Sequence, residues 1–202
     1  MLEVSVKGAR LRLETDPGLF SPKAADAGTL AMLSLIEFQP EDKVLDLGCG
    51  YGLVGILAAR FIPQQQVFLI DNDAAAVRAS RANAVLNGVA DITIVQSDGF
   101  REFREASFTK IISNPPYHVD FSVPKHFIEK GFNRLKIGGT MWMVTKRLDW
   151  YRNKLTAIFG GSRVHEVGGY FVFEATKRKS DYGRPLIGGQ TAQGRPQGKG
   201  RP

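Results

Sequence analysis

The sequence predicts an α/β fold that is built on a buried, mainly parallel β-sheet. Short apolar runs alternate with helix-like stretches over most of the chain, which is the pattern of repeated βαβ units. The last two β-rich runs, residues 163–167 and 170–176, are separated only by Gly168 and Gly169. So short a link cannot make a parallel crossover, and we expect an antiparallel hairpin at one edge of the sheet. The 202 residues suffice for one sizeable core, so a single domain is expected.

The elements follow in order along the chain. Residues 2–13 alternate between apolar and polar side chains around a Lys-Gly pair, which predicts a β-hairpin. Ser21-Pro22 indicates a helix start, because serine caps helices and proline suits the first turn, and this helix would run through residues 24–38 before Pro40. Further strands are predicted at 44–47, 67–70, 92–96, 110–113 and 141–144, and further helices at 53–61, 74–88 and 124–135.

The net charge of +7 suggests a polyanionic partner, and its position in the chain matters more than its size. From Thr176 onward the chain contains many lysines and arginines and only one acidic residue, Asp181. Most of the excess positive charge therefore lies at the C-terminal end. Residues 180–202 are rich in Gly, Pro, Gln and Arg and have little to bury, which predicts a disordered basic tail. This tail is either a solubilising end or an arm that contacts nucleic-acid phosphates.

The composition excludes several classes of site. Cys49 is the only cysteine, which excludes an intramolecular disulfide and a thiolate metal cluster. The histidines are few and scattered, so no metal is expected. No run approaches the roughly 18 apolar residues that span a bilayer, and the charged, alternating N-terminus is unlike a signal peptide. We therefore expect no membrane association and a cytoplasmic location.

A glycine-rich loop, DLGCGYGLVG, follows the predicted strand VLDL and opens a helix. Glycines at such a turn let a ligand approach bare backbone, and the helix start offers N–H groups to a phosphate or a carboxylate. Dinucleotide-binding enzymes use the same device, so the loop alone leaves the ligand class open. Asp46 favours a ligand with an ammonium group, because a carboxylate here would repel a pyrophosphate. The candidate cofactor residues of the loop are Asp46, Gly48, Cys49 and Gly50.

Carboxylates also follow the next two predicted strands. Asp71 ends the second strand, where a carboxylate can accept hydrogen bonds from both hydroxyls of a ribose. Asp98 comes just after the third strand and either accepts a bond from an adenine amino group or is a helix cap or solvated loop residue. The neighbours Asn72 and Gly99 are further candidate cofactor residues. Carboxylates at successive strand ends indicate a ligand site at the carboxyl edge of the sheet.

Asn114-Pro115-Pro116-Tyr117 follows the predicted strand 110–113 and is the most specific motif in the chain. Proline fixes its own φ and forces the preceding residue into an extended conformation, so the tetrapeptide is a rigid bracket. Pro115 has no N–H, which leaves a carbonyl acceptor beside the side-chain amide oxygen of Asn114. In isolation the same residues can be a turn followed by a core aromatic. At the end of the fourth strand of this sheet they indicate a catalytic site.

Two oxygen acceptors suit a planar NH2 nitrogen, such as the exocyclic amine of a base or a carboxamide nitrogen. Such a nitrogen is a poor nucleophile because its lone pair is delocalised. When two oxygens accept its N–H bonds, the nitrogen can pyramidalise and turn its lone pair toward a sulfonium methyl group. The proton can leave after methyl transfer, which fits the absence of an evident His/Asp dyad. Tyr117 would stack on the planar target, and His118 is either a substrate contact or a polar loop residue.

With these residues, the chain resembles the class I methyltransferases, which use S-adenosylmethionine. Within them it resembles the small-domain family typified by ribosomal RNA small-subunit methyltransferase C and by the related large-subunit methyltransferase G. The resemblance covers nearly the whole ordered chain and rests on GLFS, DAGT, DLGCGYGLVG, IDND, SDGF, NPPYH, LKIGGTMWMVTKR and IFGG. It implies a Rossmann-like fold with a seven-stranded, mostly parallel sheet and an antiparallel C-terminal hairpin. It also implies methyl transfer to guanine N2 of ribosomal RNA.

The resemblance implies roles for the candidate residues. The glycine loop and Asp71 would hold S-adenosylmethionine, and Asp98 would meet its adenine. The expected catalytic residues are Asn114, Pro115 and Tyr117, and Asn114 would also contact the cofactor. The expected substrate residues are Pro116, Tyr117, His118, Phe20, Lys23, Thr29 and Lys146.

The expected organisation is a single methyltransferase domain over residues 1–179, with a hairpin and helix in 1–40 and the catalytic core in 41–179, followed by the tail 180–202. The best-known family members carry an additional N-terminal domain, whereas here only 45 residues precede Asp46. The chain thus resembles the catalytic half alone. Docking of ribosomal RNA or a ribosomal subunit would then fall to the core surface, to the basic tail, or to a second subunit in a homodimer.

Other functions compete with this interpretation. A protein-glutamine methyltransferase shares the bracket, because a carboxamide is also planar, but those enzymes resemble this core preceded by a helical substrate-binding domain. A DNA adenine methyltransferase would usually show an inserted recognition region, and there is no room for one between Tyr117 and the final hairpin. A dehydrogenase explains the glycine loop and leaves the Asn-Pro-Pro-Tyr motif unexplained. A non-catalytic RNA-binding module is the alternative outside enzymes, although every expected cofactor position is intact.

Overall fold

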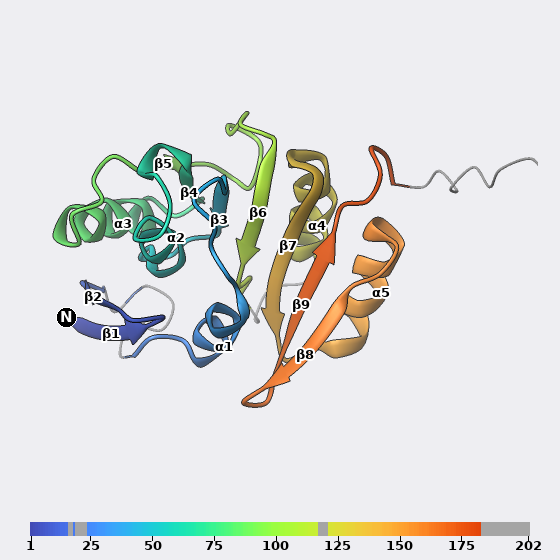
Figure 1. The fold of residues 1–202 in the computed structure, drawn as a ribbon, viewed down its shortest axis with the longest axis horizontal. Helices are drawn as coiled ribbons and strands as arrows, with labels where there is room; N and C mark the ends of the chain where they lie inside the picture. The colour runs from blue at the N-terminus through green and yellow to red at the C-terminus, as the bar shows by residue number, and fades with distance from the viewer. Residues whose placement is uncertain (16–17, 19–23, 117–120, 183–202) are drawn as a thin grey trace, which may run out of the picture.

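The structure is a computed structural model that describes residues 1–15, 18, 24–116 and 121–182. It is an α/β fold with a seven-stranded sheet in the order β5-β4-β3-β6-β7-β9-β8, beside a two-stranded sheet, β1-β2 (Figure 1). The strands are β1 Leu2–Val6, β2 Ala9–Leu13, β3 Val44–Leu47, β4 Val67–Asp71, β5 Thr93–Gln96, β6 Phe108–Ser113, β7 Leu135–Thr145, β8 Arg163–Val167 and β9 Tyr170–Thr176. The helices are α1 Ala27–Leu35, α2 Leu53–Ala58, α3 Ala74–Leu86, α4 Ser122–Arg134 and α5 Leu148–Phe159, with a 3-10 turn at Gln64–Gln66.

The prediction of a mainly parallel sheet with an antiparallel hairpin at one edge is confirmed. Strands β3 to β7 pair in parallel, whereas β9 runs antiparallel to both β7 and β8. The chain builds outward from β3 through β4 to β5 and then returns to the other side of β3 with β6. The loops that follow β3 and β6 therefore diverge at the carboxyl edge. This switch point is where open α/β sheets bind ligands.

Successive residues of each central strand face two different cores. Along β4, Val67 and Leu69 belong to a core that also takes in apolar residues of α1, α2, α3 and the β1-β2 hairpin. Phe68 and Ile70 belong to the opposite core, which contains apolar residues of α4 and α5. Figure 1 shows α2 and α3 on the side of the sheet opposite to α4 and α5. The strands are covered on both faces, which explains why their sequences read as continuous apolar runs.

The predicted hairpin over residues 2–13 is confirmed, and it is hydrogen-bonded to Asn83 on α3 and to Asn87 at the C-cap of that helix. The backbone of Arg12 exchanges two hydrogen bonds with the Asn87 side chain, of 3.0 Å to Oδ1 and 2.7 Å from Nδ2. The backbone of Glu14 exchanges two with the Asn83 side chain, of 2.7 and 2.9 Å. Asparagine amides carry a donor and an acceptor in the same arrangement as a peptide group. These two side chains therefore pair with the backbone of the hairpin as a peptide group would, and they attach the hairpin to the rest of the domain.

The first helix begins later than predicted. Residues 24–26 are not helical, and α1 starts at Ala27 with Asp26 as its N-cap. The Asp26 carboxylate accepts the backbone N–H of Thr29 at 2.8 Å, a standard capping bond. The prediction of a continuous helix from Ser21-Pro22 was wrong, although that pair itself lies outside the described residues. Serine and aspartate cap helices about equally well, so the capping signal alone could not choose between them.

Two features toward the C-terminus were not predicted. Helix α5 is absent from the predicted elements, although its buried residues Tyr151, Leu155, Ile158 and Phe159 have helical spacing. Tyr182 packs edge-on against Phe132, with ring centroids 5.5 Å apart. The chain is thus attached to the core beyond the predicted start of the tail at 180. Residues 183–202 lie outside the described residues.

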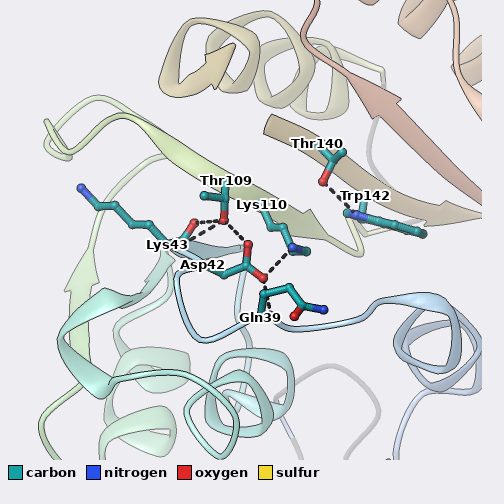
Figure 2. A network of polar contacts seen from close by, with 7 residues as sticks. All are labelled: Gln39, Asp42, Lys43, Thr109, Lys110, Thr140 and Trp142. Atoms are coloured by element: carbon teal, nitrogen blue, oxygen red, sulfur yellow. Dashed lines mark hydrogen bonds and ion pairs between the residues drawn. The ribbon is translucent and has the colours of Figure 1, made fainter. Parts of the chain in front are cut away.

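A polar network closes the amino edge of the sheet, on the side away from the switch point (Figure 2). The Asp42 carboxylate accepts hydrogen bonds from Lys110 Nζ at 2.6 Å, from Thr109 Oγ1 at 2.7 Å and from the backbone N–H of Gln39 at 2.7 Å. Thr109 Oγ1 in turn accepts the backbone N–H of Lys43 at 3.0 Å. The network ties the loop before β3 to the start of β6.

Candidate functional site

The carboxyl edge of the sheet carries a cleft with a volume of about 300 Å³. Its walls come from the ends of β3, β4, β5 and β6 and from the start of α1 and of α4. The sequence-predicted residues that line it are Thr29, Asp46, Gly48, Cys49, Gly50, Asp71, Asn72, Asp98, Gly99, Asn114 and Pro116. The fold thus brings candidates from five separate segments into one crevice at the switch point.

The glycine loop is held by the end of the neighbouring strand. Gly48 and Gly50 have φ of +75° and +56°, a conformation that favours glycine. The backbone N–H groups of Gly48 and Cys49 both donate to the Ile70 carbonyl, at 2.9 and 3.1 Å. The Gly50 N–H donates to Asp71 Oδ2 at 2.9 Å. These three N–H groups are bonded within the protein, so this part of the loop is fixed in place where it lines the cleft.

Asp46 is a buried carboxylate at the floor of the cleft. It is 3% exposed, and its Oδ2 accepts the backbone N–H of Gly55 at 2.9 Å. Burial raises the pKa of Asp46 to about 7; the Gly55 bond opposes this shift, and the negative charge of Asp71 adds to it. A cationic group beside Asp46 would favour the ionised form. The position therefore suits an ammonium group, as the sequence suggested.

Asp71 is oriented by two backbone donors. Its Oδ2 accepts the Gly50 N–H, and its Oδ1 accepts the Asp73 N–H at 3.0 Å. Each carboxylate oxygen has room for a second hydrogen bond, so the pair can still accept from two neighbouring hydroxyls. Asp98 differs, because its side chain is 60% exposed and pairs with Arg101 at 3.0 Å. Asp98 thus lines the cleft while it also makes a solvated ion pair.

Helix α4 supplies an apolar wall near Gly99 that the sequence did not reveal. Val123 and Phe127 line the same cleft as Asp98 and Gly99, and a Cβ atom at Gly99 would fall 3.4 Å from the Phe127 ring. Gly99 has a φ of +57°, and a Cβ atom there would fall 2.9 Å from the His126 ring. The close packing of α4 thus requires glycine at this position. The apolar spacing of α4 predicts a core-facing helix and gives no sign that its first turns reach the site.

Cys49 is a packing residue rather than a nucleophile. Its Sγ lies 3.5 Å from Ser80 Oγ, which donates to the Gly50 carbonyl at 2.8 Å. Burial raises the pKa of the Cys49 thiol well above its usual value, and the charges of Asp46 and Asp71 add to this shift. The thiol therefore stays protonated, and only a thiolate would be reactive. Ser80 is fully buried on α3, and no pattern in the sequence marks it as a support of the loop.

The Asn-Pro-Pro bracket begins where β6 ends. Ser113 Oγ donates to the Leu47 carbonyl at 2.7 Å, which fixes the end of β6 against β3. The Asn114 side-chain nitrogen donates to Asp26 Oδ1 at 2.7 Å and to Thr29 Oγ1 at 2.9 Å. Thr29, which was expected to contact a substrate, therefore contacts Asn114. Asp26 also belongs to the site. The sequence analysis named it only as the first residue of the DAGT motif and predicted no role for it.

The chain matches a known protein family. Residues 10–174 match the family described as "Methyltransferase small domain". The chain belongs to this family. Its relatives include a protein from Pseudomonas entomophila (strain L48) named ribosomal RNA small subunit methyltransferase C, which is 31% identical over 87% of this chain. A Bacillus subtilis (strain 168) protein, YbxB, is 33% identical over 81% of this chain and 84% of its own length.

A solved structure resembles this small methyltransferase domain closely. It is the Thermus thermophilus 16S rRNA N2 G1207 methyltransferase, RsmC, in complex with AdoMet and guanosine, with a TM-score of 0.78 and 27% identity. The match covers 87% of this chain and 50% of that one. The chain likewise spans 54% of the Pseudomonas protein. The comparisons therefore concern about half of each of these two proteins.

The remaining predicted site residues fall into two groups. Those outside the described residues are Phe20, Lys23, Tyr117 and His118. Lys146 and Pro115 are described but are not among the cleft-lining residues. Pro115 is buried, and Lys146 is exposed, with its Nζ 4.9 Å from the Tyr170 ring centroid. Within the described part of the chain, no group of His, Cys, Asp or Glu could hold a metal ion, and no helix has the length and apolar character to cross a membrane.

Proposed function

We propose that this domain is an S-adenosylmethionine-dependent methyltransferase that acts on the exocyclic amino group of a nucleobase, N2 of guanine in ribosomal RNA. The observation that carries the proposal is that Asn114 lines the same cleft as Asp46 and Asp71. A planar-amine bracket thus adjoins a crevice suited to an ammonium group and a ribose. The similarity to a structure that holds AdoMet and guanosine supports both the cofactor and the base.

The residues of the cleft fit S-adenosylmethionine. Asp46 would accept hydrogen bonds from the ammonium group, because burial disfavours the ionised carboxylate and a neighbouring positive charge would stabilise it. Asp71, held by two backbone N–H groups, would accept the ribose hydroxyls. Asp98 and the apolar side chains of Val123 and Phe127 would surround the adenine. When bound, the cofactor supplies an electrophilic methyl group on a sulfonium.

The bracket would prepare the target nitrogen. The side-chain oxygen of Asn114 would accept one N–H bond of the base amine. The backbone carbonyl oxygen of Pro115, which is buried between the lining residues Asn114 and Pro116, would accept the other, and the two bonds weaken the conjugation of the amine with the ring. The nitrogen lone pair then becomes available, and the positive charge that develops on the nitrogen is stabilised by the same two oxygens. The excess proton leaves to solvent after the methyl group has moved, so no general base is required.

The surface beside the bracket suits an RNA partner. Lys146 and Arg147 follow β7, which neighbours β6 in the sheet. Lys146 lies over the Tyr170 ring, and Arg147 lies 5.0 Å from the Phe121 ring centroid. Phe121 in turn stacks on Trp150, with centroids 4.3 Å apart. Exposed cations next to aromatic rings can bind phosphates and unstacked bases, which is how proteins recognise single-stranded RNA.

The test is transfer of labelled methyl from S-adenosylmethionine to three separate pools: protein-free ribosomal RNA, ribosomal subunits and total cell protein. The variant is Asn114→Ala, and the matched control is Asn133→Ala, which changes an exposed residue of α4. We expect label in RNA, recovered as N2-methylguanosine. It should fall by at least about 100-fold in Asn114→Ala, because one of two essential acceptors is lost, and remain unchanged in Asn133→Ala.

Other outcomes would reject the proposal in distinct ways. Label only in protein would assign the domain to the glutamine-type methyltransferases. RNA label on a different atom would keep the substrate class and reject guanine N2. Normal binding of S-adenosylmethionine without label in any pool would reject all three substrate classes, whereas failure to bind it would favour a non-catalytic RNA-binding module.

A further inference from the structure

The Asn114 side chain is held by the N-terminal segment of the chain. Its amide nitrogen donates to Asp26 Oδ1, from 88 residues away in sequence, and to Thr29 Oγ1. Asp26 Oδ1 also accepts the backbone N–H of Thr29 at 2.8 Å and its hydroxyl at 3.2 Å. One carboxylate oxygen therefore joins the start of α1 to the bracket.

This contact selects one of two orientations of the amide. The nitrogen and oxygen of an asparagine side chain are on opposite sides of a planar group and differ only in donating or accepting. A carboxylate accepts and never donates, so it attracts the amide nitrogen and repels the amide oxygen. With the nitrogen bound to Asp26, the oxygen lies on the other side of the amide group. The contact thus fixes which end of the amide is the donor and which is the acceptor, at a residue that lines the cleft.

We infer that Asp26 and Thr29 are positioning residues that set the orientation of Asn114 for methyl transfer. The inference rests on the proposed function, since it assigns the Asn114 oxygen to the target amine. Without Asp26 the amide can rotate by half a turn and present its NH2 group to the amine of the base. Two donors would then face each other, and the nitrogen would not be activated.

The neighbours of Asp26 keep it in place. Gly28 packs against Tyr170 so closely that a Cβ atom would fall 2.8 Å from the ring. Thr29 is only 7% exposed. The pKa of Tyr51 is raised by burial and then by the charge of Asp26, while a hydrogen bond to the Asp26 backbone opposes the shift. Since Tyr51 belongs to the glycine loop, the segment around Asp26 contacts both the cofactor loop and the bracket.

The decisive variant is Asp26→Ser. Serine is an equally good N-cap, so α1 should still form, but its hydroxyl is too short to reach Asn114. We expect kcat to fall by about 100-fold, as when one group that stabilises developing charge is lost, with the KM for RNA and the affinity for S-adenosylmethionine unchanged within about twofold. Thr29→Val should lower kcat about 10-fold, and the conservative Thr29→Ser should retain wild-type kcat.

A double-mutant cycle separates positioning from other roles. A residue that acts through Asn114 has no further effect once Asn114 is gone, so Asp26→Ser should not lower the residual rate of Asn114→Ala. A further loss of kcat in that background, or the appearance of a new acid limb in the pH profile, would overturn the inference and indicate a direct or structural role for Asp26. Unchanged kcat in Asp26→Ser beside an active wild type would also overturn it.

A second readout does not depend on activity. The side-chain NH2 resonance of Asn114, assigned by its disappearance in Asn114→Ala, should be protected from solvent exchange in the wild type and should lose that protection in Asp26→Ser. The Asn133 side chain, exposed on α4, is the internal reference. An unprotected Asn114 NH2 group in the wild type would refute the positioning role, even if methyl transfer were absent and the proposed function had failed on its own.

Discussion

Two buried aspartates near opposite ends of β3 have opposite properties. Asp42 precedes the strand at the amino edge of the sheet and is 4% exposed, while Asp46 near its carboxyl end is 3% exposed. For Asp42, burial alone would raise the pKa, but hydrogen bonds from Lys110, Gln39 and Thr109 together lower it. For Asp46, burial dominates and raises the pKa to about 7, because Gly55 alone opposes it.

The difference teaches which buried charge is structural and which is available to a ligand. Asp42 has a cation and two further donors within the protein, so its charge is already compensated (Figure 2). Asp46 is equally buried, and among the described residues its carboxylate has the Gly55 N–H as a donor and no cationic partner. Burial alone therefore does not identify a functional carboxylate; the donors around it do.

The largest effect is expected when Asp42, the compensated aspartate, is replaced. Replacing it as Asp42→Ala leaves the Lys110 ammonium without its partner at a side-chain exposure of only 15%. We expect the free energy of unfolding to fall by about 3 kcal/mol, measured by urea denaturation at neutral pH, because an uncompensated cation remains in a largely buried place. Affinity for S-adenosylmethionine should be unchanged. The control is Glu41→Ala at the exposed neighbour, and equal losses in both variants would show that the network is not what stabilises this edge.

The next largest effect is expected at the other end of the strand. Asp46→Asn keeps an oxygen acceptor for the Gly55 N–H and removes the charge. Titration calorimetry should show affinity for S-adenosylmethionine about 10- to 100-fold weaker, or about 1.4–2.7 kcal/mol, since a charged acceptor is lost from a buried ammonium site. Stability without cofactor should not fall. Asp91→Asn, on an exposed turn, serves as the reference, and unaltered affinity in Asp46→Asn would remove Asp46 from the cofactor site.

The smallest effect is a slope of stability with pH that has opposite signs for the two groups. The folded-state pKa of Asp46 lies above its usual value of 3.8, so its contribution to stability is full below pH 3.8 and is lost as pH rises to about 7. The slope is at most about 1.4 kcal/mol per pH unit. Asp42 has a lowered pKa, so its contribution is present above pH 3.8 and is lost as pH falls further.

Unfolding of the cofactor-free protein over pH 4–8 measures the Asp46 slope, and continuing the series below pH 3.8 measures the Asp42 slope. Asp46→Asn should gain stability relative to wild type as the pH rises toward 7, because it carries no group that must ionise in the core. The same difference measured with saturating S-adenosylmethionine should shrink, since a bound ammonium group would compensate the charge. Identical pH profiles for the two proteins would show that Asp46 titrates as it does in the unfolded chain.

Much of the fold was predictable because its signals are local. The strand at Val44–Leu47 was predicted with its observed bounds, and so were β8 and β9. The N-terminal hairpin followed from alternation around a Lys-Gly turn. The start of α1 was not predictable, because Ser21 and Asp26 are both good capping residues. Asp26 is held at the site by a hydrogen bond from the Asn114 side chain, which is far away in the sequence.

The candidate site was predictable to the extent that its residues follow strands. The glycine loop, Asp71 and Asn114 come directly after apolar runs, and parallel strands bring their carboxyl ends to one edge of a sheet. The supporting residues had no such mark. Ser80 and Asn83 are fully buried on α3, and a polar residue within a helix gives no sign of which loop it will bind.

The sequence by itself determined the α/β class, the order of strands and helices apart from α5, and the rigid and glycine-rich turns, because period, proline and glycine act through neighbouring residues. The tertiary structure alone decided which aspartate is compensated and which way the Asn114 amide faces. Lys110 is 68 residues from Asp42, and Asp26 is 88 from Asn114. Charge and hydrogen-bond orientation in a core depend on groups that only folding brings within contact and shields from water.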